Sequence, residues 1–578
     1  MHPAPRPHFT KRYRIVTEEK AGGATYTPSG LADFVASQIA AVADLSLPTI
    51  RILDPAIGDG ELLLSLLAHL KPYTAASVIV HGFDTDRVAL EQARRRLQGA
   101  FPAVTLHLES SNFLEFVLRE FAGGTDLFRP TVTASQFDLI IANPPYVRTQ
   151  IMGAEQAQML ATAFGLSGRV DLYHAFLIGM AQVLRPGGTA GIIVSNRFMT
   201  TKGGSAVRIE LRARFNLRHI WDLGDTKLFE AAVLPAIILA EGRNGHDGDP
   251  PAFTSIYETD DPAPQEAIDP IEALAMSGNV ALPDGRHFRV QQGTLDSSGS
   301  AEDVWRVATP EGDTWLATVT RHTWRTFGQI GKIRVGVKTC ADKVFIRSDW
   351  NTLPLDQQPE VLRPVTTHHT GSQFRATPDG KRRLILYPHE SVGGERRAID
   401  LQKFPRTRAY LEAHRTSLET RSYVLEAGRK WYEIWVAQDP AAWDLPKLVF
   451  RDISERPTFW IDLEGTIVNG DCYWLAAEGD EATGWLWLAA AVANSTFVEA
   501  FYDHRFNNKL YAGRRRFITQ YVEQFPLPDP TTMLARQIVA ATKAIYSAPD
   551  SVSTAGMKAD LDRMVWRAFG LGIEEVGR

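Results

Sequence analysis

A strand, a glycine-bearing turn and a helix follow one another without interruption in residues 50–70. The strand is apolar and β-prone, the turn carries Asp54, Gly58 and Gly60, and the residues after the turn have the apolar spacing of a helix. Because parallel strands need a long crossover between them, usually a helix, this order is typical of the first unit of a doubly wound α/β sheet. The glycines allow the backbone to approach a ligand closely at the carboxyl end of the strand.

The same alternation of strand-like and helical segments continues as far as residue 240. Buried parallel strands are read from short apolar runs, and helices from apolar residues spaced three and four apart. The pattern therefore predicts a mostly parallel sheet with helices on both faces. The expected strands are 77–84, 104–108, 137–142, 189–195, 219–223 and 233–240, and the expected helices include 29–42, 61–70, 86–98 and 171–185.

The glycine turn does not have the spacing of a dinucleotide-binding loop, and no Lys-Ser/Thr pair follows it as in a phosphate loop. An acidic residue at the turn, Asp54, would repel a pyrophosphate and suits a ligand that carries positive charge. A second acid, Asp84, ends the next strand, which is where such folds bind ribose hydroxyls. Capping the following helix is the alternative role for an acid at this place, and Asp86 fits that role better.

The strand 137–142 stops at Asn143-Pro144-Pro145-Tyr146. The two prolines exclude a helix and have no N–H groups, so the loop presents carbonyl oxygens without competing donors. The side-chain oxygen of Asn143 adds an acceptor, and Tyr146 adds a flat aromatic face. This combination suits a planar exocyclic NH2 group, because accepting both of its hydrogens makes the nitrogen lone pair available for attack. A plain strand-to-loop junction is the alternative interpretation.

Two further segments contribute to the predicted site. Thr27 precedes Pro28, which predicts a helix whose N-cap is Thr27 and whose first residue is proline. Asn112-Phe113 follows the third expected strand and could hold an adenine ring through an amide hydrogen bond and a stacking face. For Asn112 and Phe113, an N-cap followed by a core phenylalanine is an equally good alternative.

Composition excludes several classes of protein. A chain of 578 residues is too long for one ordinary core, and 44% hydrophobic with 22% charged residues is ordinary for a soluble protein. The net charge of -5 gives no global sign of nucleic-acid binding. Two cysteines, Cys340 and Cys472, exclude a disulfide framework and a Cys-rich zinc site. The N-terminus has no apolar signal core and the longest apolar runs are too short to span a bilayer, so we expect a cytoplasmic protein.

The second half of the chain is strand-like, aromatic and basic from about residue 326. Residues 330–338 alternate basic and apolar side chains, so one strand face could carry charge. A solvated surface face is the alternative role for each of these basic residues. Arg514–Arg516, which lie between Tyr511 and Phe517, are better candidates for phosphate contact than most of them. The candidate DNA-binding residues are Lys332, Arg334, Lys338, Lys343, Arg514, Arg515 and Arg516.

Changes in composition along the chain predict its domains. A Gly-, Asp- and Pro-rich stretch after residue 241 marks the end of the alternating region, and weak patterning follows it. We therefore expect an N-terminal arm (1–21), a catalytic domain (22–243), a connecting region (244–325), a mixed α+β specificity domain (326–530) and C-terminal helices (531–578).

One known family carries the same motifs in the same order. Residues 22–243 resemble the gamma-class DNA amino-methyltransferases, the TaqI-like adenine methyltransferases of restriction–modification systems. A Thr-Pro element that precedes the glycine turn distinguishes the gamma arrangement. The matching motifs are Tyr26-Thr27-Pro28, Asp54-Pro55-Ala56-x-Gly58-x-Gly60, Phe83-Asp84-x-Asp86, Asn112-Phe113-Leu114 and Asn143-Pro144-Pro145-Tyr146.

The resemblance implies a Rossmann-like domain that uses S-adenosylmethionine to methylate the N6 amine of an adenine flipped out of double-stranded DNA. It gives Asp84 to the ribose of the cofactor, and Asn112 with Phe113 to the adenine ring, although the family more often has Asp at position 112. The implied cofactor-binding residues are Tyr26, Thr27, Asp54, Pro55, Ala56, Gly58, Gly60, Asp84, Asn112 and Phe113.

The implied catalytic residues are Asn143, Pro144, Pro145 and Tyr146, with Phe229 stacking on the other face of the flipped base. An ordinary core phenylalanine is the alternative for Phe229. The interpretation uses the ring of Tyr146 and not its hydroxyl. Attack of the amine on the donor methyl group would be direct, so that no cysteine nucleophile is required.

The second half of the chain resembles the TaqI-type target-recognition domain more loosely. The expected partner is double-stranded DNA, with neither membrane nor metal, and a separately encoded endonuclease partner is left open. Methylation of N4 of cytosine, of RNA or of a protein glutamine amide is the alternative activity. Asn143, rather than serine, before the prolines favours adenine.

Overall fold

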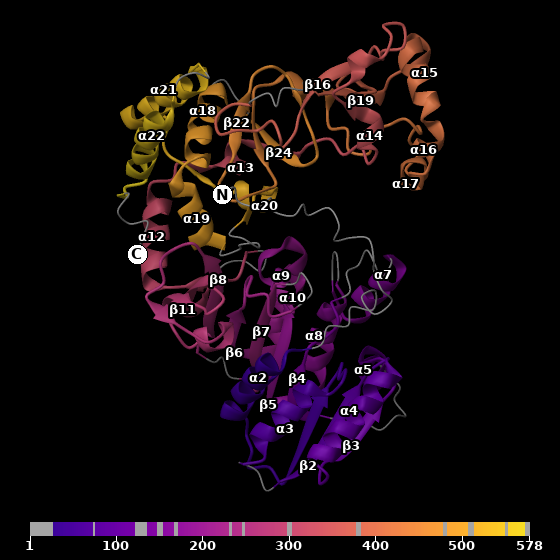
Figure 1. The fold of residues 1–578 in the computed structure, drawn as a ribbon, viewed down its shortest axis with the longest axis vertical. Coiled ribbons are helices and arrows are strands. Elements are labelled where there is room, and N and C mark those ends of the chain that lie inside the picture. The colour runs from indigo at the N-terminus through magenta and orange to yellow at the C-terminus, as the bar shows by residue number, and fades with distance from the viewer. Residues whose placement is uncertain are drawn as a thin grey trace, which may run out of the picture. The chain divides into compact units, whose positions relative to one another are not determined.

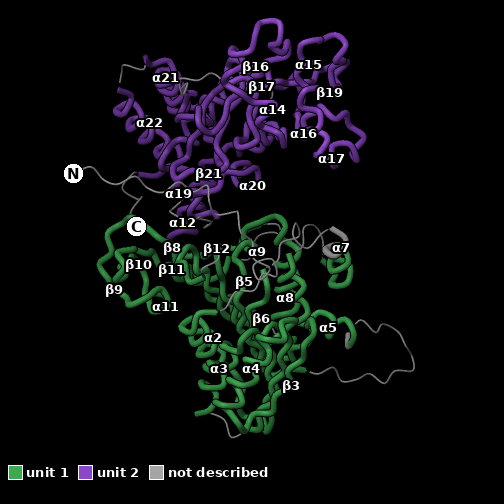
Figure 2. Tube along the Cα trace, turned by 45° about the vertical axis from the view of Figure 1, so that its right-hand side comes forward, with its two compact units in different colours: residues 1–309 green, residues 310–578 purple. Residues whose placement is uncertain are grey.

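The computed structural model places the chain in two compact units, residues 1–309 and residues 310–578 (Figure 2). The expected N-terminal arm, Tyr26 and Tyr511 lie outside the described residues. The structure describes residues 27–72, 76–121, 136–146, 154–166, 171–229, 234–245, 249–296, 303–376, 383–477, 482–506, 514–549 and 553–572.

The described residues of unit 1 form a 12-stranded sheet of order β3-β2-β1-β4-β5-β7-β6-β8-β11-β10-β9, with β12 paired to β11 (Figure 1). The strands β3, β2, β1, β4 and β5 are parallel to one another. β7 is antiparallel to both β5 and β6. The bounds are β1 Thr49–Asp54, β2 Ser77–Phe83, β3 Thr105–Glu109, β4 Phe137–Ala142, β5 Leu184–Ser195, β6 Phe215–Asp222 and β7 Pro235–Gly242.

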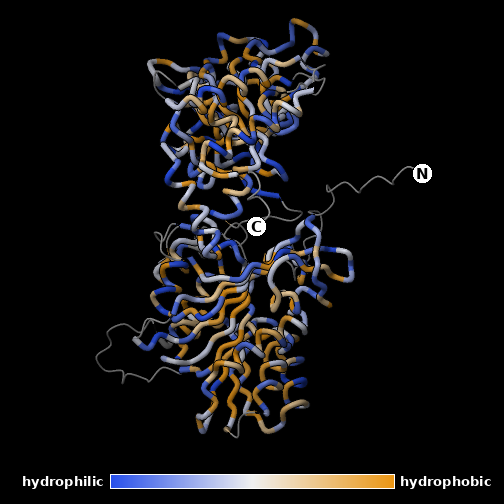
Figure 3. The backbone as a smooth tube through the Cα atoms, turned by 90° about the vertical axis from the view of Figure 1, so that its left-hand side faces the viewer, coloured by the Kyte–Doolittle hydropathy of each residue, from blue (hydrophilic) through white to orange (hydrophobic). Residues whose placement is uncertain are grey.

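Helices cover both faces of this sheet, as the alternation in the sequence predicts. On β4, a strand buried along its whole length, Leu139 and Ile141 pack with α2, α3 and α4, whereas Ile140 and Ala142 pack with α5, α8 and α10. Figure 3, in which hydrophobic residues are orange, shows them along the strands of this sheet. The helices are α2 Ser29–Val42, α3 Glu61–Leu70, α4 Arg87–Ala100, α5 Phe113–Phe121, α7 Ala154–Ala163, α8 Leu172–Val183, α9 Arg197–Thr200 and α10 Ser205–Arg214.

The segment expected to connect two domains instead extends the sheet. β8 pairs in parallel with β6, and β11 pairs antiparallel with β8. Composition marks the loops between these strands, but the pairing of β8 with a strand earlier in the chain leaves no local signal, and the units divide at 309/310. The bounds are β8 Ala252–Thr259, β9 Gln265–Glu266, α11 Pro270–Ala273, β10 Gly278–Ala281, β11 His287–Asp296 and β12 Arg306–Ala308.

Unit 2 is a mixed α+β unit whose described residues include two four-stranded sheets, β14-β24-β20-β22 and β15-β17-β16-β23. Its helices are α12 Pro310–Arg321, α13 Phe327–Ile330, α14 Asp342–Phe345, α15 Pro405–Ala413, α16 Arg415–Glu419, α17 Ser422–Glu426, α18 Ala482–Ala493, α19 Thr496–Phe506, α20 Thr519–Val522, α21 Met533–Ser547 and α22 Ala555–Ala568. Its strands are β13 Arg325–Thr326, β14 Gly331–Val335, β15 Ile346–Arg347, β16 Leu362–Thr366, β17 Leu384–Leu386, β18 His389–Val392, β19 Glu395–Ala398, β20 Lys447–Arg451, β21 Ile453–Ser454, β22 Phe459–Asp462, β23 Ile467–Val468, β24 Cys472–Ala477, β25 Arg515–Arg516 and β26 Pro526–Leu527.

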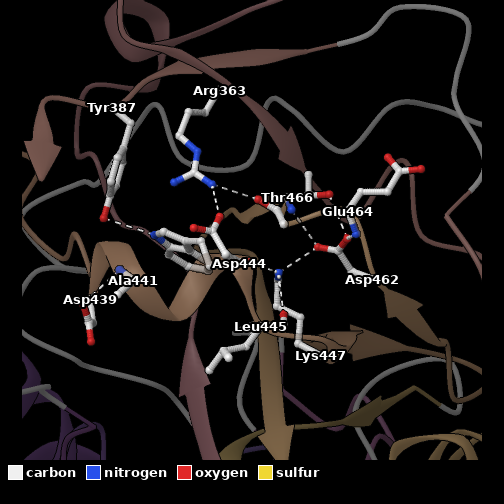
Figure 4. Close-up of polar contacts among 12 residues, drawn as sticks. Arg363, Tyr387, Asp439, Ala441, Asp444, Leu445, Lys447, Asp462, Glu464 and Thr466 are labelled. Carbon is white, nitrogen blue, oxygen red and sulfur yellow. Dashed lines mark hydrogen bonds and ion pairs between the residues drawn. The ribbon is translucent and has the colours of Figure 1, made fainter. Parts of the chain in front are cut away.

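A buried ion pair joins β20 to β22 (Figure 4). The Nζ atom of Lys447 lies 2.9 Å from Oδ2 of Asp462 and donates to the carbonyl of Trp443 at 2.6 Å. The Asp462 carboxylate also accepts from the backbone N–H groups of Glu464 and Thr466. Burial lowers the pKa of Lys447, whereas Asp462 favours its charged form. The fully buried ammonium is thus stabilised by neighbours that only the folded chain provides.

We expect Lys447→Met to destabilise this sheet by about 3–5 kcal/mol, because it leaves the Asp462 carboxylate buried without its cation. Hydrogen exchange in β20 and β22 measures the opening free energy locally, without requiring two-state unfolding of both units. Glu464→Gln, on the neighbouring exposed side chain, is the control and should leave exchange unchanged. Parental exchange in Lys447→Met would show that the pair contributes nothing to the sheet.

A candidate active site at the carboxyl edge of the sheet

The predicted site residues come together because neighbouring parallel strands end at one edge of the sheet. β1 lies between β2 and β4, and all three run in the same direction. Asp54 ends β1, Asp84 follows β2 and Asn143 follows β4. The loops that follow these strands are where open α/β sheets bind their ligands.

The glycine turn after β1 is held by the residue that follows β2. Asp84 accepts hydrogen bonds from the backbone N–H groups of Gly58 and Asp86, both at 2.8 Å. Gly58 has a φ of 52°, and no described atom lies within 4 Å of where its side chain would begin. Gly60, at φ 87°, lies so close to α4 that a Cβ would come within 3.1 Å of the Ala93 Cβ. The turn is therefore rigid, and the space beside Gly58 is open.

Asp54 is fully buried and incompletely bonded. Its Oδ1 accepts from the N–H of Ala56 at 3.1 Å, whereas its Oδ2 has no hydrogen-bond partner among the described residues. Burial, with a further contribution from the charge of Asp84, raises the pKa of Asp54 to about 8. An unpartnered buried carboxyl oxygen is costly, so this site is suited to a ligand that brings a donor or a positive charge.

The Asn143 amide contacts a hydroxyl group at each end. Its Nδ2 donates to the Oγ1 of Thr27 at 3.0 Å, and the hydroxyl of Tyr146 donates to its Oδ1 at 2.7 Å. The prediction that Thr27 caps the helix is wrong: Pro28 occupies the N-cap position of α2, and no side chain caps that end. The local rule fails because Thr27 has a partner, Asn143, in the loop that follows β4, far away in the sequence.

Tyr146 is half-buried at this edge, and its ring meets the buried Tyr173 edge to face, with the ring centroids 6.3 Å apart. Burial raises the pKa of Tyr146 above its ordinary value, so its hydroxyl stays protonated and serves as a donor. Tyr173 lies in the first turn of α8, a helix that the sequence predicted without singling out this residue.

Asn112 and Phe113 occupy their alternative roles. The Asn112 Oδ1 accepts from the N–H of Leu114 at 2.9 Å, as an N-cap does. Phe113 is fully buried, and its ring lies against Phe83 and Phe176 in the core. The expectation that Phe113 presents a face to an adenine ring does not fit this packing, because neighbouring rings already cover the Phe113 ring. The motif alone does not show these neighbours.

Phe229 is also in the core, packed in the same hydrophobic cluster as α2 and α3. The structure thus places it in its alternative role, as a buried phenylalanine ahead of β7. A ring that stacks on a base must first leave this packing, so stacking by Phe229 remains a prediction that the described geometry does not favour.

The sequence reasoning missed a buried polar cluster that fixes the turn leading to Phe229. Asp222, at the end of β6, accepts from Asn196 at 2.9 Å and from the Tyr257 hydroxyl at 2.7 Å. It also accepts from the N–H of Gly224, and burial raises its pKa to about 6 despite these hydrogen bonds. Asn196 follows the predicted strand 189–195, and Asp222 is the last residue but one of the predicted strand 219–223. These positions are a signal that could have identified both residues. Tyr257 lies on β8, which was expected to be a connection.

The chain aligns with curated relatives over most of its length. Residues 80–229 match the Eco57I restriction-modification methylase family, and residues 398–527 match the TaqI-like C-terminal specificity domain. The type II methyltransferase M.BanIII of Aneurinibacillus aneurinilyticus is 36% identical over 96% of this chain and 98% of its own length. The chain belongs to the type II methyltransferases. This family was expected from the order of the motifs.

More distant relatives agree with this assignment. The type II methyltransferase M.XhoI of Xanthomonas vasicola is 24% identical to this methyltransferase, over 96% of this chain and 98% of its own length. The type IIL restriction-modification enzyme MmeI, solved in complex with DNA, has the same fold. That structure matches with a TM-score of 0.56 and 14% identity, over 94% of this chain and 71% of the MmeI chain.

The basic residues of β14 have the predicted alternation in this DNA methyltransferase. Lys332 is exposed, Ile333 is buried, and Arg334 lies over the Trp474 ring at 5.2 Å from its centroid. Lys338 and Lys343 are exposed as well. The three lysines are exposed to solvent, whereas Arg334 is half-buried. Contact of these residues with phosphate groups remains a prediction.

The arginine cluster on β25 is different. Arg515 is buried and makes two hydrogen bonds of 2.8 Å to the carboxylate of Asp503. Arg516 is half-buried beside Asp452, and the exposed Arg514 lies 3.8 Å from Glu455. This environment does not favour the expectation that Arg515 contacts DNA, because its guanidinium neutralises half-buried carboxylates. The local sequence does not show the positions of these carboxylates.

Neither a membrane span nor a metal centre emerges from the described parts of the chain. Within them, no helix is long and apolar enough to cross a bilayer, and no three side chains of His, Cys, Asp or Glu gather as metal ligands do.

We expect Arg515→Met to destabilise unit 2 by about 1–3 kcal/mol, because it leaves the half-buried Asp503 carboxylate without its cation. Lys332→Met should instead leave stability unchanged, weaken DNA binding to all sequences, and reduce the slope of log affinity against log salt by about 1. Fluorescence anisotropy with a labelled duplex at several salt concentrations, combined with thermal unfolding, measures both.

Each variant serves as the control for the other. If Arg515→Met weakened DNA binding while its unfolding midpoint stayed at the parental value, the structural assignment of Arg515 would be refuted. A Lys332→Met protein with the parental salt slope would remove Lys332 from the interface.

Proposed function

We propose that this methyltransferase transfers a methyl group from S-adenosylmethionine to the N6 amine of an adenine that is flipped out of double-stranded DNA. The observation that carries the proposal is the Asn143-Pro144-Pro145-Tyr146 loop at the end of β4, beside the glycine turn of β1. The base must leave the duplex, because its amine cannot reach the carboxyl edge of the sheet while the base is stacked and paired.

The residues around the glycine turn fit the cofactor. S-adenosylmethionine carries a positive sulfonium and a positive ammonium group, and Asp54 has a buried oxygen without a partner among the described residues. The open space beside Gly58 and the carboxylate of Asp84 lie on the same edge. When bound, the cofactor supplies the electrophilic methyl group.

The loop after β4 supplies the acceptors that the amine needs. The amine of adenine delocalises its lone pair into the ring and is a poor nucleophile. Asn143 Oδ1 and the Pro144 carbonyl can accept its two hydrogens, which favours a tetrahedral nitrogen with an available lone pair. Pro145 supplies no competing N–H group. Positioning of the amine in line with the methyl group would supply most of the rate.

Adenine is favoured over the other amines by the residue that precedes the prolines. Asn143 stands where a serine would favour N4 of cytosine, the alternative considered from the sequence. A basic, aromatic second unit with a matched specificity domain supports DNA rather than a protein glutamine as the substrate.

Asn143→Ala should slow methyl transfer in a single turnover by roughly 100–1,000-fold. The removed hydrogen bond acts mainly as the amine becomes nucleophilic, so the loss should be comparable to that of an oxyanion-hole donor, about 2.7–4 kcal/mol. Transfer of a labelled methyl group measures the rate, and 2-aminopurine at the target base reports extrusion, which should change less.

Asn112→Ala is the matched control, because it removes a half-buried asparagine that caps α5. At saturating cofactor, its transfer rate should stay close to the parental rate. Near-parental transfer by Asn143→Ala would exclude the proposed mechanism, and label recovered on cytosine would exclude adenine as the substrate.

We also expect cofactor binding to release a proton near pH 7. The pKa of Asp54 is raised from 3.8 to about 8, so the free protein carries it mostly protonated at pH 7, and a cationic ligand favours the ionised form. The raised pKa also affects stability. The contribution of Asp54 to the free energy of unfolding of the ligand-free protein falls as the pH rises from 3.8 to about 8, because Asp54 loses its proton at lower pH in the unfolded chain than in the folded chain.

Calorimetry in buffers of different ionisation enthalpy measures this proton release. The release should vanish above about pH 9, where Asp54 is already ionised. Asp54→Asn is the control that separates Asp54 from groups on the cofactor itself. Equal proton release by Asp54→Asn and the parent would show that Asp54 is not the source.

A further inference from the structure

We propose that Thr27 is a positioning residue. Its hydroxyl holds the Asn143 amide so that the amide oxygen is turned toward the amine that receives the methyl group. The inference rests on the proposed function and adds a role within the same site. Thr27 was expected to cap α2 or to line the cofactor pocket, and neither role accounts for its hydrogen bond to Asn143 Nδ2.

The two hydroxyl groups around the amide favour a single orientation. A phenol oxygen shares its lone pair with the ring, so Tyr146 is a better donor than acceptor, and it favours the amide oxygen as its partner at 2.7 Å. The aliphatic hydroxyl of Thr27 accepts well, and it takes the Nδ2 hydrogen at 3.0 Å. The reversed amide would present N–H groups to an amine that itself needs acceptors.

The scaffold keeps Thr27 in place. Pro28, whose ring restricts φ, separates Thr27 from the start of α2. α2 packs closely on β5 because Gly191 has no side chain: a Cβ there would lie 2.7 Å from the Ile39 side chain and 2.8 Å from that of Val35. The hydroxyl that holds Asn143 is thus fixed to the same sheet as Asn143 itself.

The two hydroxyl groups beside the amide are not equivalent during the reaction. A bound adenine brings its own hydrogen to Asn143 Oδ1 and can replace the Tyr146 hydroxyl there. Nothing in the amine can replace Thr27 at Nδ2, since that position requires an acceptor. Loss of the Thr27 hydroxyl should therefore slow the chemical step.

Thr27→Val keeps the shape of the side chain and removes the hydroxyl. We expect single-turnover methyl transfer at saturating S-adenosylmethionine to fall about tenfold, the usual consequence of one lost hydrogen bond. Thr27→Ser, which keeps the hydroxyl, should recover the parental rate within about threefold. The dissociation constant of the cofactor, measured by calorimetry, should change less than about twofold in Thr27→Val. Thr27→Ala is a second hydroxyl-free variant that should behave like Thr27→Val.

A double-mutant cycle shows whether Thr27 acts through Asn143. In the Asn143→Ala background, Thr27→Val should cause no further loss of rate, because the amide that it positions is already gone. An undiminished tenfold loss in that background, a parental rate in Thr27→Val, or a loss confined to cofactor affinity would each overturn the proposal.

Analysis of the methylated product separates this inference from the proposed function. Mass spectrometry of digested DNA from the parent enzyme identifies the accepting amine. If that amine is not N6 of adenine, the proposed function fails. The cycle still reports on Thr27 and Asn143, because the rates are measured on whichever amine accepts the methyl group.

Discussion

The parallel pairing of β1 with β2 on one side and β4 on the other is the constraint on which the site depends. Each of these strands is continuous for only a few residues, yet the pairing aligns their carboxyl ends at one edge. Asp54, Asp84 and Asn143 are far apart in the sequence and become neighbours only through this register. A shift of one residue in β4 would turn its buried side chains to the opposite faces of the sheet, so the packing of both helix layers also fixes the catalytic loop.

Sequence reasoning succeeded where a motif carries its own geometry. Strand, turn and helix around Gly58 and Gly60 follow from local patterning, and both glycines have the positive φ that excludes most other residues. The α/β sheet with helices on both faces follows from the same patterning, as does the exposed basic face of β14. The order of the motifs was sufficient to identify the family.

The failures share a physical cause, which is a partner that lies far away in the sequence. Thr27 has the composition of a cap but bonds to Asn143, and Arg515 has the composition of a phosphate contact but neutralises Asp503. Phe113 fits a ligand motif, although Phe83 and Phe176 already cover its ring. Short-range rules rank the roles that a residue can take, and the tertiary neighbours then choose among them.

The pairing of β8 with β6 defines what can be removed from the chain without damage to the catalytic unit. A fragment that ends after β7, where the alternating pattern stops, would leave β6 without its outer neighbour. The freed backbone N–H and C=O groups would then form an open edge along a strand whose last residues are buried in the intact unit, a template for self-association. A soluble catalytic fragment must therefore extend through β12. Residues 250–309 are thus part of the smallest catalytic fragment that lacks this open edge.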